Sequence, residues 1–431
     1  MNLDTGTQIH RWLTDLFPIC RSLSGAGVRD TLSYIQGLLP EVRIKSVPSG
    51  TQVFDWTIPD EWNIKDAYVA DACGNRVIDF NKNNLHVVGY SVPIDEEKSF
   101  SQLDKHLHSL PELPEAIPYV TSYYKSDWGF CLSERERAQL RRYPDAKYRV
   151  KIDSELAPGM LNYGELVIPG TTDEEILLST YVCHPSMANN ELSGPGVVTA
   201  LAKWINDLKH RHYTYRILFL VETIGAIAYL SEHIEKMKKN TIAGFVVTCV
   251  GDERSYSYVA SRQGNTVADR IAKHTLRHIA GDFVEYSYLD RGSDERQYCS
   301  PGIDLPVCSV CRTKYNEYPE YHTSLDNLKL VTPRGLQGAY NVYKKMIEFL
   351  EANKTYRTKI RGEPQLGKRG LYPMLSTRDS HEQVSDMMNL IAYSDGYNSL
   401  LDIAILQDVC MADLIPIAEK LVEADILEVT R

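Results

Sequence analysis

The spacing of hydrophobic residues predicts two helices at the start of the chain. Apolar side chains recur every three or four residues in TGTQIHRWLTDLFPICRSL (residues 5–23) and again in GVRDTLSYIQGLLPEV (residues 27–42). This interval places them on one face of a helix. The Thr- and Asp-containing start of the chain suits a helix N-terminus. We therefore expect two amphipathic helices before residue 44.

The pattern changes between about residues 44 and 160. Short runs rich in β-branched and aromatic residues are interrupted there by Pro, Gly and Asn, as in QVFDWTIP, NIKDAYVAD, NRVIDF, LHVVGYSVP and YRVKID. Runs of this kind, bounded by turn-forming residues, are typical of short strands. The segment is therefore predicted to be a β-rich module.

Continuous apolar runs alternate with helical patterns between about residues 163 and 350. The runs EILLSTYV, YRILFLVE and IAGFVVTCVG show no period of two, and GVVTALAKWINDL and AIAYLSEHIEKM, which lie between them, have helical spacing. Strands buried on both faces are apolar throughout. We predict an α/β fold with a mostly parallel central sheet flanked by helices. Ligand sites of such sheets form at the carboxyl ends of the strands.

A linker-like stretch, residues 353–370, precedes a tail with a different pattern. From residue 376 the segments VSDMMNLIAYSDGYNSLLDIAIL and MADLIPIAEKLVEADILEV indicate short helices followed by an apolar strand, as in a winged helix. This tail carries eleven acidic residues against three basic ones, a net charge of -8. DNA affinity needs Lys and Arg to neutralise phosphates, so we expect a protein-binding or dimerising role instead.

Composition narrows the class of protein further. The 431 residues carry a net charge of -10, which disfavours nucleic acid and anionic lipid as partners. No signal peptide and no apolar run long enough to span a bilayer is evident, and nine scattered cysteines suit reduced thiols. We interpret the single C-x-x-C, Cys308 to Cys311, as buried structural thiols. We expect a cytoplasmic protein that forms a homo-oligomer.

Polar residues that can bind a metal follow several of the predicted strands. His184 ends one apolar run, with Asn190 and Glu191 on the loop after it, and Glu222 and Asp252 end two others. His nitrogens and carboxylate oxygens are zinc ligands. Any one of these residues alone is better explained as a capping or hydrogen-bonding group. Together they predict a metal site, because they converge on one edge of the sheet.

Several long segments carry a family resemblance over nearly the whole chain. STYVCHPSMANNELSG, VETIGAIAYL, VGDERSYSY, GSDERQY and YHTSLDN occur in the order of the signature segments of the zinc aminopeptidase superfamily, which includes aminopeptidase Y and glutaminyl cyclase. The chain more closely resembles a group of bacterial aminopeptidase-like proteins often found in polysaccharide-biosynthesis loci.

The resemblance implies a zinc-exopeptidase-like fold with three parts. Residues 1–43 and 161–355 would form the catalytic domain, residues 44–160 an inserted β-rich domain, and residues 356–431 a linker and a winged-helix domain.

The same resemblance assigns roles to individual residues. His184 would bind the first metal, with Asp252 as a second ligand of that ion. His322 would be the histidine of the second metal, and Glu222 the carboxylate that activates the metal-bound water.

Two positions depart from the superfamily pattern. The aspartate that bridges two metals aligns with Asn190, and the second glutamate aligns with Thr223. An amide oxygen is a weaker ligand for a divalent cation than a carboxylate. We therefore expect one zinc ion per chain, held by His184, Asp252 and His322, with Asn190 and Glu191 as further candidate ligands. Glu191 either takes the place that Asn190 vacates or points to solvent, and in the second case the site would be weak or empty.

Four residues are predicted to contact the substrate. In LDRGSDERQYCSPGIDLP, Asp294 and Arg296 would lie on a substrate-facing loop, where an Arg suits a carboxylate or phosphate. The alternative is a solvated charged turn. Tyr321 and Tyr124 are the other two, and aromatic residues near Tyr124, among them Tyr123 and Trp128, either wall the cleft or pack in a core.

The function predicted is that of a metal-dependent hydrolase of the aminopeptidase type. It would cleave an amide bond next to a free amine in a peptide or an aminoacylated small molecule, with Glu222 as the base. One alternative is a single-zinc acyl transferase or cyclase of the glutaminyl cyclase kind. Another is a catalytically impaired binding or assembly protein that keeps the fold.

Overall fold

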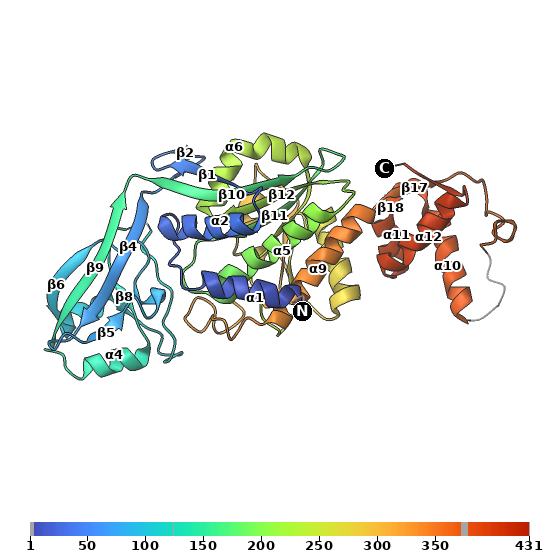
Figure 1. Ribbon diagram of the computed structural model, residues 1–431. Helices are drawn as coiled ribbons and strands as arrows, with labels where there is room; N and C mark the ends of the chain where they lie inside the picture. The colour runs from blue at the N-terminus through green and yellow to red at the C-terminus, as the bar shows by residue number, and fades with distance from the viewer. Residues whose placement is uncertain (1–3, 124, 372–377, 431) are drawn as a thin grey trace. The chain divides into compact units, whose positions relative to one another are not determined.

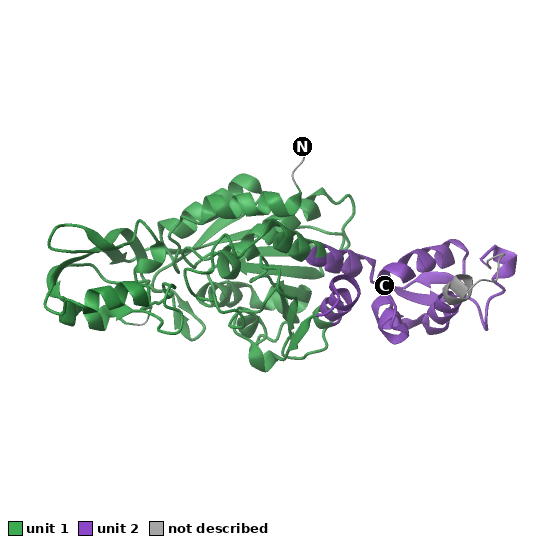
Figure 2. Ribbon diagram, turned by 90° about the horizontal axis from the view of Figure 1, so that it is seen from below, with its two compact units in different colours: residues 1–269, 283–341 green, residues 270–282, 342–431 purple. Residues whose placement is uncertain are grey.

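The computed structural model of the protein describes residues 4–123, 125–371 and 378–430. They divide into two compact units, coloured separately in Figure 2. Unit 1 lies within residues 1–269 and 283–341, and unit 2 within residues 270–282 and 342–431. Helix α9 (Pro333–Ala352) belongs in part to each unit.

An eight-stranded sheet forms the centre of unit 1, within the residues described. Its strands lie in the order β1 (Arg43–Pro48), β10 (Met160–Ile168), β12 (Thr214–Leu220), β11 (Glu175–Tyr181), β13 (Thr241–Val246), β16 (Val307–Cys311), β14 (Ser257–Val259) and β15 (Val284–Tyr286). The pairs β12–β11, β11–β13 and β13–β16 are parallel, and antiparallel strands pair on either side of them. Every residue of β11 is buried, as its unbroken apolar run predicts. The α/β fold class predicted from the sequence is confirmed.

Helices cover the central sheet. Figure 1 shows α1 (Thr5–Leu16), α2 (Ala26–Leu38) and α5 (Ser193–Asp207) in front of the sheet. The two helices predicted at the start of the chain are thus present. The remaining helices of unit 1 include α6 (Ile224–Asn240) and the short α8 (Glu295–Tyr298). Helix α7 (Val267–Thr275) begins in unit 1 and lies mostly in unit 2.

A smaller sheet lies between β1 and β10 in the chain. It has the strand order β5 (Arg76–Asp79), β4 (Glu61–Ala70), β9 (Lys147–Ala157) and β6 (Ile94–Ser99), and α4 (Glu134–Arg141) also belongs to this region. These elements enclose a hydrophobic core of their own. The segment predicted as β-rich begins at residue 44, but β1 pairs with β10 in the central sheet. The chain therefore leaves that sheet only after Pro48.

Unit 2 contains a three-stranded sheet and three helices at the C-terminal end of the chain. The sheet order is β18 (Asp395–Ser399), β17 (Thr355–Thr358) and β19 (Leu427–Val429), and the helices are α10 (Arg378–Tyr393), α11 (Leu400–Gln407) and α12 (Met411–Glu423). His274, near the end of α7, accepts a hydrogen bond from the backbone N–H of Met411 at 3.0 Å. The winged-helix prediction for this region is confirmed.

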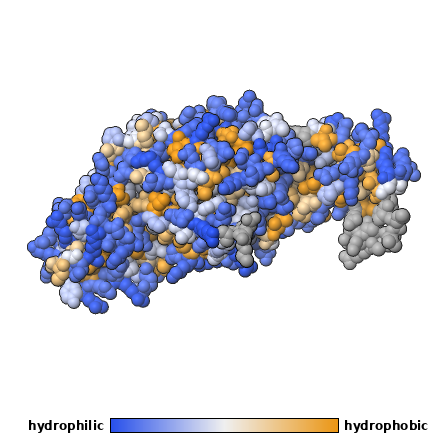
Figure 3. Space-filling view, in the orientation of Figure 1, coloured by the Kyte–Doolittle hydropathy of each residue, from blue (hydrophilic) through white to orange (hydrophobic). Residues whose placement is uncertain are grey.

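Hydrophilic and hydrophobic residues are interspersed on the face shown in Figure 3. Within the described part of the chain, none of the helices is both long and apolar enough to cross a membrane.

Candidate functional site

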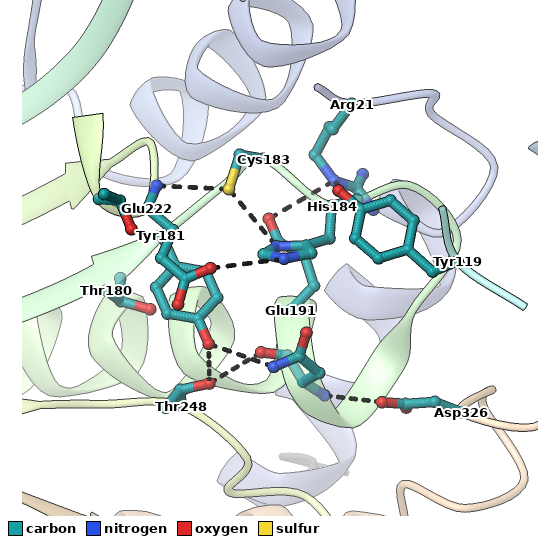
Figure 4. Close-up of polar contacts among 12 residues, drawn as sticks. Arg21, Tyr119, Thr180, Tyr181, Cys183, His184, Glu191, Glu222, Thr248 and Asp326 are labelled. Carbon is teal, nitrogen blue, oxygen red and sulfur yellow. Dashed lines mark hydrogen bonds and ion pairs between the residues drawn. The ribbon is translucent and has the colours of Figure 1, made fainter. Parts of the chain in front are cut away.

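His184 lies at the carboxyl end of the parallel part of the central sheet, three residues after β11. Its Nδ1 atom is 2.7 Å from Glu191 Oε2, and its Nε2 atom is 3.5 Å from Glu222 Oε2 (Figure 4). Glu222 follows the neighbouring parallel strand β12, so the end of each strand delivers one of the two residues. The side chain of Glu222 is 20% exposed, whereas that of Glu191 is fully buried.

Glu191 lies on the opposite side of the imidazole from Glu222. It belongs to a single π-helical turn, Ala188–Leu192, which directs its carboxylate back towards His184. Its second oxygen, Oε1, is 3.9 Å from Nε of the buried Arg21 and has no hydrogen-bond partner among the described residues. Arg21 Nε donates to the backbone oxygen of His184 at 3.0 Å. Glu191 therefore neither points to solvent nor occupies a place on the Nε2 side of His184.

Cys183 completes the group of candidate ligand atoms that lie within 4.8 Å of one another, together with His184 and Glu191. Its Sγ atom is 3.4 Å from His184 Nδ1 and accepts a hydrogen bond from the backbone N–H of Glu222. Burial raises the pKa of the Cys183 thiol well above its usual value. A neutral thiol is a poor ligand, so this group is better suited to holding a proton on Nδ1 than a metal.

The turn that carries Asn190 is held by a buried carboxylate. Asp326 accepts hydrogen bonds from the backbone N–H groups of residues 188, 189 and 190, and from the hydroxyl of Tyr318. Asn190 itself donates to the hydroxyl of Tyr181 at 3.2 Å. Its Oδ1 atom is buried without a hydrogen-bond partner in the part of the chain that the structure describes.

Asp252 is engaged elsewhere and is not part of the group around His184 among the residues described. Its carboxylate accepts from Thr313 Oγ1 at 2.7 Å, from Asn189 Nδ2 at 3.1 Å and from the backbone of Arg254. Strand β13 ends at Val246, and five residues separate it from Asp252. The metal-binding role of Asp252 stays a prediction, and its carboxylate is engaged by these hydrogen bonds.

His322 approaches His184 from the loop before α9. The two ring centroids are 5.5 Å apart. Tyr321 stacks on the His322 ring at 3.9 Å, and Tyr119 contacts both imidazoles with ring centroids at 5.2 Å. Tyr119 comes from the β-rich region, and its hydroxyl is 2.8 Å from that of Tyr123. The structure thus brings together His184, Glu222 and His322, as predicted.

Asp294 and Arg296 contact the strained residue Thr223. Thr223 has a φ of +63°, a conformation that is unfavourable for a β-branched side chain. Its backbone N–H donates to Asp294 Oδ1 at 2.7 Å, and its hydroxyl accepts from Arg296 Nη2 at 2.6 Å. Asp294 is fully buried at the start of α8, so this segment is not a solvated turn.

A cavity of about 400 Å³ opens over these groups. Its walls include Trp56, Tyr119 and Tyr123 from the β-rich region, and Arg296 and Gln297 from α8. It is lined by Leu23, Trp56, Tyr119, Thr121, Tyr123, Cys183, His184, Glu222, Thr223, Ile224, Arg296, Gln297 and His322. Tyr124, predicted as a substrate contact, lies outside the described residues.

Two of the residues that shape the site were not predicted. Arg21 and Tyr119 lie 163 and 65 residues before His184 in the chain, in segments without a strand-end or spacing motif. Trp128, predicted either to wall the cleft or to pack in a core, packs against the core of the β-rich region and stacks on His106 with ring centroids at 3.8 Å.

Burial dominates the electrostatics of the site. It lowers the pKa of His184 to about 3, with a smaller effect of Arg21, and that of His322 to about 3, with a smaller effect of His184. Burial raises the pKa of Glu191 to about 8 against the opposing effect of Arg21. It also raises the pKa of Asp294 to about 7 and that of Glu222 well above its usual value. Both imidazoles are therefore neutral, the form that binds metals.

Two ligand atoms on the Nε2 side of His184 have the separation expected around a zinc ion. Ligand atoms at about 2.1 Å from a tetrahedral ion lie about 3.4 Å apart, and His184 Nε2 and Glu222 Oε2 are separated by 3.5 Å. His322 does not complete a set of three with them, because among the described residues only Cys183, His184 and Glu191 have ligand atoms that all lie within 4.8 Å of one another.

The fold places the protein among the aminopeptidase-like α/β proteins. The zinc aminopeptidase BSAP from Bacillus subtilis is similar in fold, with a TM-score of 0.57, 14% identity and coverage of 80% of this chain and 94% of that one. The chain belongs to the family described as Domain of unknown function (DUF4910), whose model matches residues 10–353. A winged helix-turn-helix model matches residues 354–429.

Two comparisons with Clostridium acetobutylicum proteins extend over almost the whole chain. One protein, provisionally named a polysaccharide biosynthesis protein with aminopeptidase-like domain, is 46% identical over 403 residues, which is 93% of this chain and 91% of that protein. A crystal structure of a protein provisionally described as a peptidase has 42% identity and a TM-score of 0.93, and covers 99% of this chain and 97% of that one. An aminopeptidase-like, peptidase-type protein is the class that these comparisons support.

Proposed function

We propose that the protein is a metal-dependent hydrolase of the aminopeptidase type. The observation that carries this proposal is the convergence of His184 Nε2 and the Glu222 carboxylate, 3.5 Å apart, beneath a cavity of about 400 Å³. The aminopeptidase-like fold supports it. The substrate proposed is a peptide or an aminoacylated small molecule, and the provisional name of the 46% identical relative favours an aminoacylated sugar among the latter.

We propose that His184 and His322 hold one zinc ion beside the carboxylate of Glu222. When bound, such an ion polarises the scissile carbonyl and lowers the pKa of water. Glu191 keeps the Nδ1 proton of His184 in place, because its buried carboxylate lies 2.7 Å away. The neutral His184 then presents Nε2 towards Glu222.

Glu222 is proposed as the group that moves the proton. Its burial and its proximity to Asp294 raise its pKa, and a raised pKa brings a carboxyl group closer to the range of an effective acid and base. As a carboxylate it accepts the proton of the attacking water, and as an acid it donates that proton to the leaving amine. Aromatic side chains line the cavity beside these groups, among them Trp56, Tyr119 and Tyr123.

A binding protein without catalysis is the second candidate. It is favoured by the position of Asp252, whose oxygens are held by Thr313, Asn189 and Arg254 rather than directed at His184. It is also favoured by the neutral amide of Asn190 at the position of the bridging carboxylate in the superfamily.

The test is hydrolysis of a panel of aminoacyl 4-nitroanilides and aminoacylated hexosamines by the zinc-loaded protein, with and without a chelator. We expect turnover that the chelator removes. Glu222→Gln should lower it by about 10²–10⁴-fold, the usual contribution of a general base. The matched control is Glu232→Gln, because the side chain of Glu232 on α6 is 64% exposed.

Zinc content separates the possible roles of Glu222. A variant that keeps its zinc but loses turnover supports the role of base. Loss of zinc from Glu222→Gln would instead make Glu222 a ligand, and no turnover of any substrate by the zinc-loaded protein would favour the binding protein.

A further inference from the structure

A second cavity lies in unit 1, and its lining shares no residue with that of the candidate site. Its volume is about 610 Å³, within the range of small-molecule sites of about 300–1,000 Å³. It is formed by the first turns of α9, by the segment after Asp252 and by the residue that follows β16. The lining residues are Asp4, Glu253, Tyr256, Arg312, Pro333, Arg334, Gln337, Gly338 and Asn341.

Arg312 is a buried arginine without an anion. It is 8% exposed, and its guanidinium lies 3.9 Å from the ring centroid of Tyr256. No side chain or backbone group of the described residues forms a hydrogen bond or ion pair with this guanidinium, and its Nε atom is buried without a partner. The Nε donor of this side chain is thus unused among the described residues.

The other two arginines that are buried among the described residues, Arg21 and Arg216, have hydrogen bonds and carboxylate neighbours, although Nη2 of Arg21 has no hydrogen-bond partner. Arg21 donates to two backbone oxygens and lies 3.9 Å from Glu191. Arg216 forms hydrogen bonds with Glu175 at 2.6 and 2.7 Å and with Glu165 at 3.0 Å. A buried charge without a partner is costly, so the contrast with Arg312 indicates that its partner comes from outside the chain.

The two carboxylates of this cavity are engaged with other groups. Glu253 accepts a hydrogen bond from Thr332 and forms an ion pair with Arg334 at 3.6 Å. Asp4 caps α1 by accepting from the backbone N–H of Thr7 at 2.7 Å. Neither forms an ion pair with Arg312.

Gly338 keeps open the space in front of the guanidinium. A Cβ atom at this position of α9 would lie 2.6 Å from the hydroxyl of Tyr256 and 3.0 Å from Arg312 Nη1. Glycine in the interior of a helix costs about 1 kcal/mol relative to alanine. Here it leaves room for the stacked pair of Tyr256 and Arg312.

We propose that this cavity binds a small molecule through a carboxylate or phosphate group held by Arg312. The planar guanidinium binds both anions in a bidentate manner, and its stacking on Tyr256 fixes the plane in which the anion is held. The amide side chains of Gln337 and Asn341 suit a ligand with a polar body. This site is independent of the proposed hydrolase activity.

The experiment is calorimetric titration of the full-length protein with inorganic phosphate and, separately, with acetate, at constant pH and ionic strength. We expect saturable binding of at least one anion, and the comparison of the two titrations identifies the group that is recognised. Arg312→Lys keeps the charge and loses the bidentate geometry, so it should weaken binding at least tenfold. Arg262→Lys is the matched control, because Arg262 is exposed and already paired with Asp304.

A second variant separates loss of anion binding from loss of the fold, in case Arg312→Lys does not fold. Gly338→Ala keeps a helix-forming residue in α9 and fills the space beside the guanidinium, so it should weaken anion binding while the thermal unfolding midpoint stays within a few degrees. Absence of binding of both anions to the wild-type protein at 10 mM, about the upper limit of a useful small-ligand affinity, would overturn the proposal. Equal binding by wild type and Arg312→Lys would also overturn it.

Discussion

Replacing Glu191 with Gln should weaken zinc binding without changing the number of ions bound. The Glu191 carboxylate lies 2.7 Å from His184 Nδ1, on the side of the ring away from Glu222. Glutamine keeps the size of the side chain and an oxygen that accepts a hydrogen bond. It removes the negative charge that makes the imidazole a stronger ligand of zinc. Partners that orient a metal-binding histidine in this way contribute about 10–100-fold to metal affinity, and we expect a loss in this range.

The pKa of Glu191 adds an expectation for the pH dependence of this effect. Burial raises that pKa from 4.5 to about 8, so the metal-free protein keeps the carboxyl proton at neutral pH. This proton must leave before the carboxylate can accept a hydrogen bond from His184 Nδ1 in the zinc-bound state. Zinc affinity of the wild type should therefore rise by up to about tenfold per pH unit below pH 8 and then level off. At pH 6.5, release of the proton costs about 2 kcal/mol, because one pKa unit corresponds to about 1.4 kcal/mol.

The stability of the metal-free protein should depend on pH through the same carboxyl group, that of Glu191. The pKa of Glu191 is higher in the folded state than in the unfolded state, so the native state binds more protons between pH 4.5 and about pH 8. The stabilisation is present below pH 4.5 and is lost as the pH rises through this window, by at most about 1.4 kcal/mol per pH unit. Glu191→Gln lacks this contribution.

The assay is competition for zinc with a chromophoric chelator from pH 6.0 to 8.5. The logarithmic slope of zinc affinity against pH should be lower by about one in Glu191→Gln than in the wild type, and Glu232→Gln should match the wild type. Urea unfolding of the chelator-treated proteins over the same range measures the effect on stability. An unchanged affinity and slope in Glu191→Gln would refute the reasoning, and complete loss of zinc would make Glu191 a direct ligand.

Three further predictions concern other parts of the chain. Wild-type protein should hold about one zinc ion per chain by elemental analysis. Asn190→Asp should raise this number towards two, because the carboxylate places a charge where the Oδ1 atom of Asn190 has no partner among the described residues. Two tightly held ions in the wild type would contradict this prediction. Asp326→Asn should lower the free energy of unfolding at pH 8 by about 2–4 kcal/mol. Hydrogen bonds to charged groups contribute about 1.5–3 kcal/mol each, and Asp326 accepts several of them. An unchanged midpoint of urea unfolding would refute this prediction. Deletion of residues 376–431, with eleven acidic and three basic residues, should change the oligomeric state by light scattering, and the full-length protein should show no salt-sensitive binding of mixed duplex DNA.

The central fold could be predicted because burial on both faces leaves a clear pattern. Strand β11 is buried throughout and β12 nearly so, and both are mostly apolar. Strands β14 and β15 have three residues each and β15 is mostly exposed, so they leave no such pattern. Residues 43–48 alternate in polarity like the strands that follow them, and only their pairing with β10 assigns β1 to the central sheet.

The candidate site could be predicted where a titratable side chain directly follows a buried strand. His184 and Glu222 come within three residues of the ends of β11 and β12, so the edge of the sheet brings them together. Asp252 lies farther from its strand, with five residues between it and the end of β13, and its carboxylate accepts hydrogen bonds from Thr313 and Asn189. Arg21 could not be found at all, since a buried arginine between two helices acquires its role only from tertiary packing.

The distribution of the site along the chain has a consequence for its biosynthesis. Arg21 lies near the start of the chain, Tyr119 in the β-rich region, and His322 and Asp326 just before α9. A ribosome must therefore release more than the first 326 residues before the pocket around His184 can close. Metal acquisition would then be a late step of maturation. Fragments that start at the second catalytic segment, residue 161, would lack both the arginine behind Glu191 and the tyrosine between the two imidazoles.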